Sequence, residues 1–433
     1  MRRPELLAPA GDLERCRTAI LYGADAVYLG GKQFSLRSRA SNFTMDDIRE
    51  ACSFASEHGA HIHVTVNMIP HNEDFEGLAD YLVQLQDAGV STVIAASPAV
   101  MAMVREYAPA MEVHCSTQMS ITNAAAADYL AKTLGINRVV LARECTMEDV
   151  RRITASCSVD TEAFIHGGMC VNYSGRCTLS NRMTLRDANR GGCAQSCRWR
   201  YRVFEGDRET GEGPWFTMGS RDLCAAREIA DLMEAGVASF KIEGRMKTEY
   251  YVASIVSGYR HLLDDLYEHN GILAPKRLEA HRREIMKGEN RAVWNGFYGG
   301  VRGAEGLISD LKAGNDVNHD FLGTVADYDP VTETMTMVTR NPFDLGEAVE
   351  VLSPGQENRV FRISEIKNEN GEYLEISRQP MRELRLQVPF AVQKDDILRR
   401  SREDDHCRRG QRQGSHAGRP ASGGTDYAGP GAS

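Results

Sequence analysis

Short apolar runs alternate with helical patterns along residues 1–267, and this alternation is the strongest constraint on the fold. Each run has the length of a buried strand, and apolar residues at helical spacing follow it, as with Leu13, Cys16 and Ile20 after Asp12. Eight such runs match the count and the size of a (β/α)8 TIM barrel. The runs cover residues 5–10, 26–31, 61–68, 91–97, 112–118, 138–144, 161–167 and 239–244.

A doubly wound open sheet is the rival architecture, because alternation alone does not show that a sheet closes. No GxGxxG or GxxxxGK[ST] motif follows any of the runs, which removes the usual reason to prefer an open nucleotide-binding sheet. We therefore expect an α/β fold with a TIM-barrel-like N-terminal domain over residues 1–267.

The rest of the sequence divides into three further regions. Residues 268–320 are polar with helical stretches, and we expect a helical connector there. Residues 321–400 carry regularly spaced short strands with turn signals between them, which indicates a small all-β barrel domain. Residues 401–433 are rich in Gly, Ser, Ala and Arg without periodicity, so we expect a disordered tail in which Cys407 is not a ligand.

The overall composition is that of an ordinary globular protein. A net charge of −9 gives no indication of nucleic-acid binding for the molecule as a whole. The N-terminus has no apolar run of signal-peptide length, and nowhere do about 18 apolar residues follow one another. We therefore expect a cytoplasmic protein without a membrane segment, in which the eleven cysteines are mostly free thiols, metal ligands or catalytic groups.

Four cysteines lie close together between the seventh and the eighth run. They are separated by six, fifteen and three residues, and they are Cys170, Cys177, Cys193 and Cys197. Four thiols in so short a stretch favour one shared ligand, either an iron–sulfur cluster or a zinc ion. Structural zinc usually takes its thiols in close pairs, which fits the second pair and not the first. A cluster is therefore the preferred interpretation, and zinc is the alternative.

The interval that holds these cysteines is far longer than an ordinary strand-to-helix connection. Loops that follow barrel strands lie on the face where such enzymes place their chemistry. We therefore expect the Cys-rich loop over residues 167–217 to cap the barrel mouth. Cys224, farther along, is an ambiguous fifth candidate ligand, and a small buried thiol is the favoured interpretation there.

Seven arginines accompany the cysteines in residues 170–202, where Asp187 is the single acid. Asparagine and aromatic residues are interleaved with them, a mixture that holds phosphates, stacks on unpaired bases and binds carboxylates. A solvated charged face is the alternative. Arg176 and Arg198 adjoin cysteines, so they are the best candidates for contact with an anionic substrate or RNA.

Charged residues also stand at the ends of the seventh and eighth runs. Glu243 is a candidate acid or base, and Lys241 and Arg245 beside it are candidate substrate-binding residues, with a salt-bridge network as the alternative. His166 is a candidate proton donor or a packed histidine. Further candidates for substrate binding at comparable strand ends are Gln118 and Arg143.

The segment EAFIHGGMCVNYSGRCTLS, residues 162–180, resembles the signature of the U32 peptidase family, also called collagenase-like. Other matching stretches, such as ELLAPAGDLE, NRGGCAQSCRWRY and FKIEGRMKTEYYV, extend the similarity from about residue 4 to residue 400. Gly168 departs slightly from the signature, because a serine or alanine is usual there.

The resemblance implies an activity that differs from the family name. The better understood branches are oxygen-independent hydroxylation proteins that carry a four-iron, four-sulfur (4Fe-4S) cluster. This chain is most similar to the branch that hydroxylates the wobble uridine of tRNA with the help of prephenate. The resemblance therefore implies a cluster on the four cysteines, tRNA and the dicarboxylate prephenate as partners, and a tRNA uridine hydroxylase as the enzyme.

A U32-type peptidase remains the alternative enzyme. The sequence has no HExxH zinc motif and no GxSxG elbow, so a hydrolase would lack its commonest marks. Pairing of a cysteine with a histidine depends on the fold and cannot be read from the sequence. A third possibility is an RNA-binding or assembly protein that acts with a second subunit, and the oligomeric state is left open.

Overall fold

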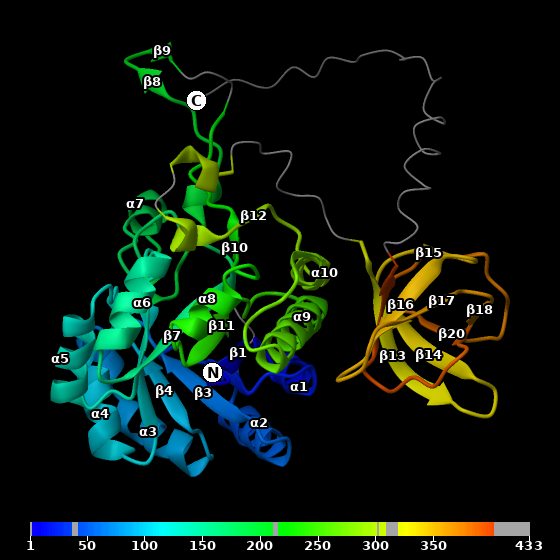
Figure 1. Cartoon of the computed structure of the whole chain (residues 1–433), viewed down its shortest axis with the longest axis horizontal. Helices are drawn as coiled ribbons and strands as arrows, with labels where there is room; N and C mark the ends of the chain where they lie inside the picture. Colours follow the sequence, from blue (N-terminus) through cyan, green and yellow to red (C-terminus); the bar gives the residue numbers. More distant parts are fainter. Residues whose placement is uncertain (1, 37–41, 211–214, 301–302, 309–318, 402–433) are drawn as a thin grey trace, which may run out of the picture. The chain divides into compact units, whose positions relative to one another are not determined.

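The chain forms two compact units, drawn in Figure 1 from a computed structural model. The first unit spans Met1–Asn318, and the second contains His319–Ser353 and the residues from Glu357 onward. The structure describes residues 2–36, 42–210, 215–300, 303–308 and 319–401. The expected disordered tail, with Cys407, falls almost entirely on residues 402–433 and lies outside the described residues.

Eight parallel strands of the first unit close into a barrel. The eighth of them, β11, pairs in parallel with both β1 and β7, which joins the two ends of the sheet. All eight expected runs form these strands, so the closed barrel is confirmed and the open sheet is wrong. The strands are β1 (Glu5–Pro9), β2 (Ala26–Leu29), β3 (His61–Val66), β4 (Thr92–Ala95), β5 (Glu112–Cys115), β6 (Arg138–Val140), β7 (Asp160–Gly167) and β11 (Ser239–Ile242).

Helices surround the barrel, and neighbours from α1 to α6 contact one another, as do α6 and α8, and α9 and α1 (Figure 1). Side chains cap several of them: Asp12 accepts from the amide of Arg15 at α1, and Thr44 and Thr146 form capping boxes at α2 and α6. The helices are α1 (Leu13–Leu21), α2 (Met45–Glu57), α3 (Leu78–Asp87), α4 (Pro98–Tyr107), α5 (Ala124–Leu134), α6 (Met147–Ser156), α8 (Ile229–Glu234) and α9 (Glu249–Glu268).

The long interval between β7 and β11 folds into a lobe of its own. We call residues 168–210 the cysteine lobe. Within it, α7 (Leu179–Thr184) packs against a single 3-10 turn at Ser196–Arg198, and β8 (Phe204–Glu205) pairs with β9 (Arg208–Glu209). After the lobe, β10 (Asp222–Cys224) runs antiparallel to β7 and extends the barrel sheet.

The segment expected as a connector packs onto the barrel unit. Helix α10 (Pro275–Met286) lies against α9, and β12 (Val293–Trp294) pairs with β10. Gly258 of α9 allows the close approach of α10, because a Cβ there would lie 2.7 Å from the Ile285 side chain. The described part of this segment is thus an outer layer of the barrel.

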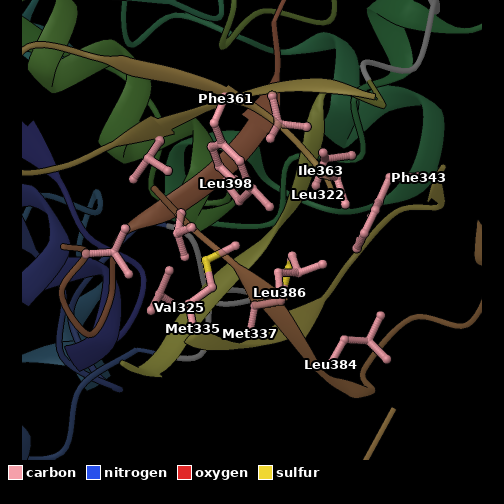
Figure 2. Packing of buried hydrophobic residues seen from close by; sticks show 14 of the residues in the cluster. Leu322, Val325, Met335, Met337, Phe343, Phe361, Ile363, Leu384, Leu386 and Leu398 are labelled. Carbon is pink, nitrogen blue, oxygen red and sulfur yellow. The ribbon is translucent and has the colours of Figure 1, made fainter. Parts of the chain in front are cut away.

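The second unit consists of β-sheets, as expected for an all-β domain. Its main sheet has seven antiparallel strands in the order β17-β16-β21-β13-β14-β20-β18, and β15 pairs with β19. Buried side chains such as Val325, Met337 and Leu398 form one hydrophobic core, shown in Figure 2. The strands are β13 (Phe321–Asp329), β14 (Thr334–Thr339), β15 (Phe343–Asp344), β16 (Ala348–Leu352), β17 (Arg359–Arg362), β18 (Ile366–Asn368), β19 (Ile376–Ser377), β20 (Glu383–Gln387) and β21 (Ile397–Arg400).

No helix in the described part of the chain combines the length and the apolar character needed to cross a membrane.

Candidate functional site

A cavity of about 160 Å³ opens where the barrel strands end. Its walls include Tyr28 of β2, Thr65 of β3 and Phe164 of β7, together with residues that directly follow strands, such as Asn67 and Gln118. The carboxyl ends of the strands are the face at which TIM barrels place their active sites. The cavity therefore occupies the expected position for chemistry.

All four cysteines of the lobe line this cavity as free thiols. Burial raises the pKa of the Cys197 thiol, and so do the nearby thiols of Cys170, Cys193 and Cys177, while Arg198 acts in the opposite direction. Because the Cys197 thiol interacts electrostatically with the other three thiols, the four sulfurs lie close to one another. The fold thus brings together residues that are up to 27 positions apart (197 − 170 = 27).

Two of these sulfurs accept hydrogen bonds from nitrogen donors. The Asn172 side-chain amide donates to Cys177 Sγ at 3.2 Å, and the Gln195 backbone amide donates to Cys193 Sγ at 3.4 Å. N–H donors to sulfur are common around metal-bound cysteines. The residues present therefore fit a thiolate-ligated metal centre.

The spread of the sulfurs bears on the kind of centre. Four sulfurs on one tetrahedral zinc ion lie about 3.8 Å apart, given a Zn–S bond of about 2.3 Å. Among the described residues, however, no three of the four sulfurs lie within 4.8 Å of one another. The arrangement is wider than a preformed site for a single zinc ion, and a larger ligand would suit it better.

Two glycines allow the cysteine lobe to lie directly on the barrel mouth. Gly167 has a φ of +105°, and a Cβ there would meet the Glu243 carbonyl oxygen at 2.3 Å. Gly175 has a φ of +71°, and its Cβ would lie 1.9 Å from the Gln118 carbonyl oxygen. Between them, the Ser174 amide and hydroxyl both donate to the Glu144 carboxylate at 2.9 Å. The lobe is thus fixed to the loops that follow β5, β6 and β11.

Arg143 and Glu243 form an ion pair in the cavity wall. Arg143 Nη2 lies 3.1 Å from Glu243 Oε2, its Nη1 donates to the Gly168 carbonyl, and its guanidinium stacks 3.9 Å above the Phe164 ring. The pair links the ends of β6 and β11 to the first residue of the cysteine lobe. A planar guanidinium can satisfy all of these contacts at once, which a lysine cannot do.

A buried charge network lies directly below the cavity. Lys241 Nζ is 2.8 Å from Glu162 Oε1, and Arg138 Nη1 is 3.2 Å from Glu162 Oε2. Burial by itself would raise the pKa of Glu162, but Lys241 and Arg138 more than offset it and lower that pKa to about 2. The Lys241 ammonium also lies 4.5 Å from the centre of the Tyr28 ring. Lys241 therefore presents a fixed positive charge at the cavity floor.

Arg245 borders another side of the cavity. It donates to Ser35 Oγ at 2.9 Å, to the Leu36 carbonyl at 3.1 Å and to Thr65 Oγ1 at 3.2 Å, and it is almost fully buried. Gly30 leaves room for it, because a Cβ at residue 30 would meet Arg245 Nη2 at 2.2 Å. This packing explains why residue 30, in the AVYLGG stretch, is a glycine.

Three of the expected site residues lie apart from the cavity lining. Arg176 is exposed and donates from Nε to Ser120 Oγ at 3.2 Å. Arg198 forms an ion pair with the buried Asp222 at 3.1 Å. His166 is buried and is described below. The cavity brings together the others, which are Gln118, Arg143, Lys241, Glu243, Arg245 and the four cysteines.

His166 belongs to a separate buried cluster. Its Nε2 lies 2.7 Å from Glu289 Oε1, and its Nδ1 lies 3.1 Å from the Tyr259 hydroxyl. Burial alone would lower the pKa of His166, but contact with Cys224 and Glu289 raises it to about 9. The pKa of Cys224 is lowered, because the favourable interaction with His166 outweighs burial. Cys224 is buried and does not line the cavity.

The sequence reasoning missed three residues of the site. Glu144 directly follows Arg143, so the same rule of polar strand ends could have found it. Tyr28 and Glu162 lie inside strands, where a polar side chain gives no signal of its own. Both residues contact Lys241 across the barrel, and this contact shows that they belong to the site. The contact arises from the fold and cannot be read from the sequence.

Comparison with known proteins covers both units. The model of peptidase family U32 matches residues 11–307, and the model of the U32 C-terminal domain matches residues 317–399. The chain is 40% identical over 409 residues to tRNA hydroxylation protein P1 of Bacillus subtilis, which is 93% of this chain and 96% of that protein.

Two other relatives have different described roles. The chain is 39% identical over 272 residues to a 23S rRNA 5-hydroxycytidine synthase of Escherichia coli, which is 63% of this chain and 41% of that protein. It is 33% identical over 312 residues to a collagenase of Porphyromonas gingivalis, which is 69% of this chain and 74% of that protein. The relatives thus include proteins described by RNA hydroxylation and one described by proteolysis.

Proposed function

The chain belongs to peptidase family U32, and within that family we propose that it is an iron–sulfur enzyme for oxygen-independent hydroxylation of the tRNA wobble uridine to 5-hydroxyuridine. One observation carries the proposal: four cysteines and the charged ends of the barrel strands line the same cavity. The relative that matches over nearly its whole length is described as a tRNA hydroxylation protein, which supports tRNA as the substrate. The cytoplasm is the expected compartment for such a substrate.

We propose a 4Fe-4S cluster held by Cys170, Cys177, Cys193 and Cys197, with zinc as the alternative. The wide spread of the sulfurs and the N–H donors to Cys177 and Cys193 support the cluster. When bound, it would supply electron transfer beside the substrate.

The remaining cavity residues suit an anionic cosubstrate. Lys241 at the floor and Arg245 at the side are positive, and a dicarboxylate such as prephenate is the proposed oxygen donor. Arg143 holds the Glu243 carboxylate through Oε2 at 3.1 Å, which orients the carboxyl group to take or return a proton. Because the cavity is small and residues of the cysteine lobe form part of its wall, the lobe would limit the access of water to the reacting groups.

The function is tested by nucleoside analysis of tRNA. A strain that lacks the gene is compared with the same strain complemented by the full-length chain, and 5-hydroxyuridine derivatives are quantified by mass spectrometry. We expect their loss on deletion and their return on complementation, under aerobic and anaerobic growth alike. Unchanged tRNA with a loss of hydroxycytidine from rRNA would move the substrate to rRNA, and no change in either RNA would contradict the proposal.

The cofactor is tested on the anaerobically purified full-length protein. We expect a brown protein with about four iron atoms per chain and broad absorption near 400 nm, as for cysteine-ligated clusters. A colourless, iron-free protein that binds stoichiometric zinc would instead establish the zinc site.

A peptidase is the second candidate, because the buried cluster contains a cysteine, a histidine and a carboxylate in contact. Cys224, His166 and Glu289 have the residue types of a cysteine-peptidase triad, and the pKa of Cys224 is lowered. All three are buried, so a peptide carbonyl has no path to the thiol in this conformation. Gelatin digestion by the wild-type protein that Cys224→Ala abolishes would establish this function, and we expect no digestion by either protein.

A further inference from the structure

The cysteine lobe exposes arginines that form no ion pair. In the part of the chain that the structure describes, Arg176, Arg182 and Arg200 have no acidic partner, and Arg176 contacts only neutral oxygen through Ser120. Asp187, the nearest acid in sequence to Arg176 and Arg182, accepts from the Asn189 amide at 2.8 Å. These three arginines therefore carry positive charge that the fold itself does not neutralise.

Most exposed arginines elsewhere in the described part of the barrel unit are paired, and Arg283 of α10 is an exception. Arg151 lies 2.9 Å from Asp231, Arg152 lies 2.7 Å from Glu148, and Arg49 lies 2.7 Å from Asp46. Arg190, Arg198 and Arg202 of the lobe are paired as well, so it is the group of three unpaired arginines that distinguishes the lobe from the rest of the described surface of the barrel unit. The protein has a net charge of −9, yet this surface keeps these three arginines unpaired. Such a surface is complementary to a polyanion.

The same lobe exposes large apolar side chains. Tyr173 is 49% exposed, Trp199 is 42% exposed and Leu185 is 90% exposed. Leu185 ends α7 with a φ of +57°, the left-handed conformation that is common at helix C-termini. Helix α7, which ends beside Leu185, packs on the 3-10 turn that precedes Trp199, so Leu185 and Trp199 belong to one compact structure.

We propose that the exposed surface of the cysteine lobe binds a single-stranded RNA loop, with Arg176, Arg182 and Arg200 on the phosphates and Tyr173 and Trp199 stacked on unpaired bases. Single strands are the form of RNA that aromatic side chains can stack upon, whereas a duplex hides its bases. Tyr173 both lines the cavity and reaches the surface, so a base held at this surface lies next to the cavity. This inference rests on the proposed function and names the surface that would present the uridine.

The proposal is tested by RNA binding with the full-length, cofactor-loaded protein. The probe is a fluorescein-labelled tRNA anticodon stem-loop with uridine at the wobble position, and its affinity is measured as a function of salt. We expect the triple variant R176Q/R182Q/R200Q to bind at least ~10-fold more weakly near 0.1 M salt, with a salt slope lower by ~0.7 for each arginine that contacts a phosphate. The matched control R151Q/R152Q, which removes paired arginines, keeps the affinity and the slope.

Stacking is tested separately with Trp199→Ala and Trp199→Phe. We expect the alanine variant to lose affinity ~5-fold or more with an unchanged salt slope, and phenylalanine to restore most of it. If the arginine variant binds the stem-loop like the wild type and still restores 5-hydroxyuridine in cells, the surface is wrong while the proposed function stands. If the wild type itself neither binds nor modifies tRNA, the proposed function fails. Binding of a protein partner, and of no RNA, at this surface would also overturn the inference.

Discussion

At the scale of single residues, the charged side chains buried in the barrel interior are paired with side chains of opposite charge. Glu162 lies between Lys241 and Arg138, and none of the three could be buried alone without a large cost. The same network fixes the Lys241 ammonium at the floor of the cavity. Stability and the proposed binding of substrate therefore depend on the same carboxylate.

We predict that Glu162→Gln destabilises the barrel unit by about 3–5 kcal/mol, because the buried Lys241 loses its ion-pair partner and Arg138 is left with Glu5 alone. Since the pKa of Glu162 falls from its ordinary 4.5 to about 2, its contribution is fully present above about pH 4.5 and is lost as the pH falls toward 2. Urea unfolding of wild type and variant at several pH values checks both effects. Parallel stability curves from pH 6 to pH 3 would contradict the assignment.

We predict that Arg143→Lys reduces the rate of hydroxylation by ~10–100-fold. Without the guanidinium the Glu243 carboxylate is displaced, and displacement of a reacting group lowers a rate by about this factor. Lysine cannot reach Glu243 and Gly168 and also stack on Phe164. Iron content and thermal stability should stay close to those of the wild type. Arg105→Lys is the matched control, because Arg105 also donates to a backbone carbonyl, at 3.4 Å from Met111, but lies away from the cavity.

Residue roles could be predicted only where position along a strand reveals them. Gln118, Arg143 and Glu243 follow strands of a barrel, and the rule that strand ends form the site places all of them in the cavity lining. His166 follows the same rule, yet it contacts Tyr259 of α9 and Glu289 in a buried cluster. The register of β7 with β11 shifts at Lys241/Ile242, and a shift of this kind changes which side chains reach the cavity without leaving a trace in the sequence.

At the scale of elements, the cysteine lobe and the barrel mouth form one structure. Glycines at 167 and 175 let the lobe backbone approach the loops after β11 and β5, and Glu144 accepts two hydrogen bonds from Ser174. The eight strands could be predicted because each is an apolar run followed by a helix. The attachment of the lobe could not, because it depends on contacts between segments that are far apart in sequence.

We predict that Gly175→Ala loosens the lobe and lowers the retained iron by more than half. Its Cβ would lie 1.9 Å from the Gln118 carbonyl oxygen, so the backbone of one loop has to move. Gly59→Ala is the matched control, because Gly59 has a similar φ of +69° but no atom within 4 Å of the added Cβ. The control should cost only the ~1–2 kcal/mol of left-handed strain and keep its iron. Equal iron in the two variants would show that the contact with Gln118 is unimportant for the site.

At the scale of the whole molecule, the chain combines two units that each have a core. The second unit buries Leu322, Met335 and Leu386 completely, and the described contacts within it are those of an antiparallel sheet. Its all-β class could be predicted from regular short strands, since alternation and turns are local properties. The pairing order of those strands could not, because β21 at the end of the unit lies between β16 and β13.

We predict that a fragment of residues 319–401 folds by itself, because its core is contributed by its own strands. Circular dichroism should show β-structure and a cooperative thermal transition, and the Met335→Ala variant should lower the midpoint in both the fragment and the full chain. A fragment without a cooperative transition would mean that the core needs the barrel unit.

The central claim is that the cavity of the barrel mouth, with its four cysteines, is the site of uridine hydroxylation. The most direct measurement is the 5-hydroxyuridine content of tRNA from the deletion strain complemented with Cys177→Ser or with Cys157→Ser, at equal protein levels. Cys177 lines the cavity, whereas Cys157 ends α6 and donates from Sγ to the Val159 carbonyl at 3.1 Å. We predict no 5-hydroxyuridine with Cys177→Ser and wild-type levels with Cys157→Ser. Full modification by the Cys177 variant would contradict the account.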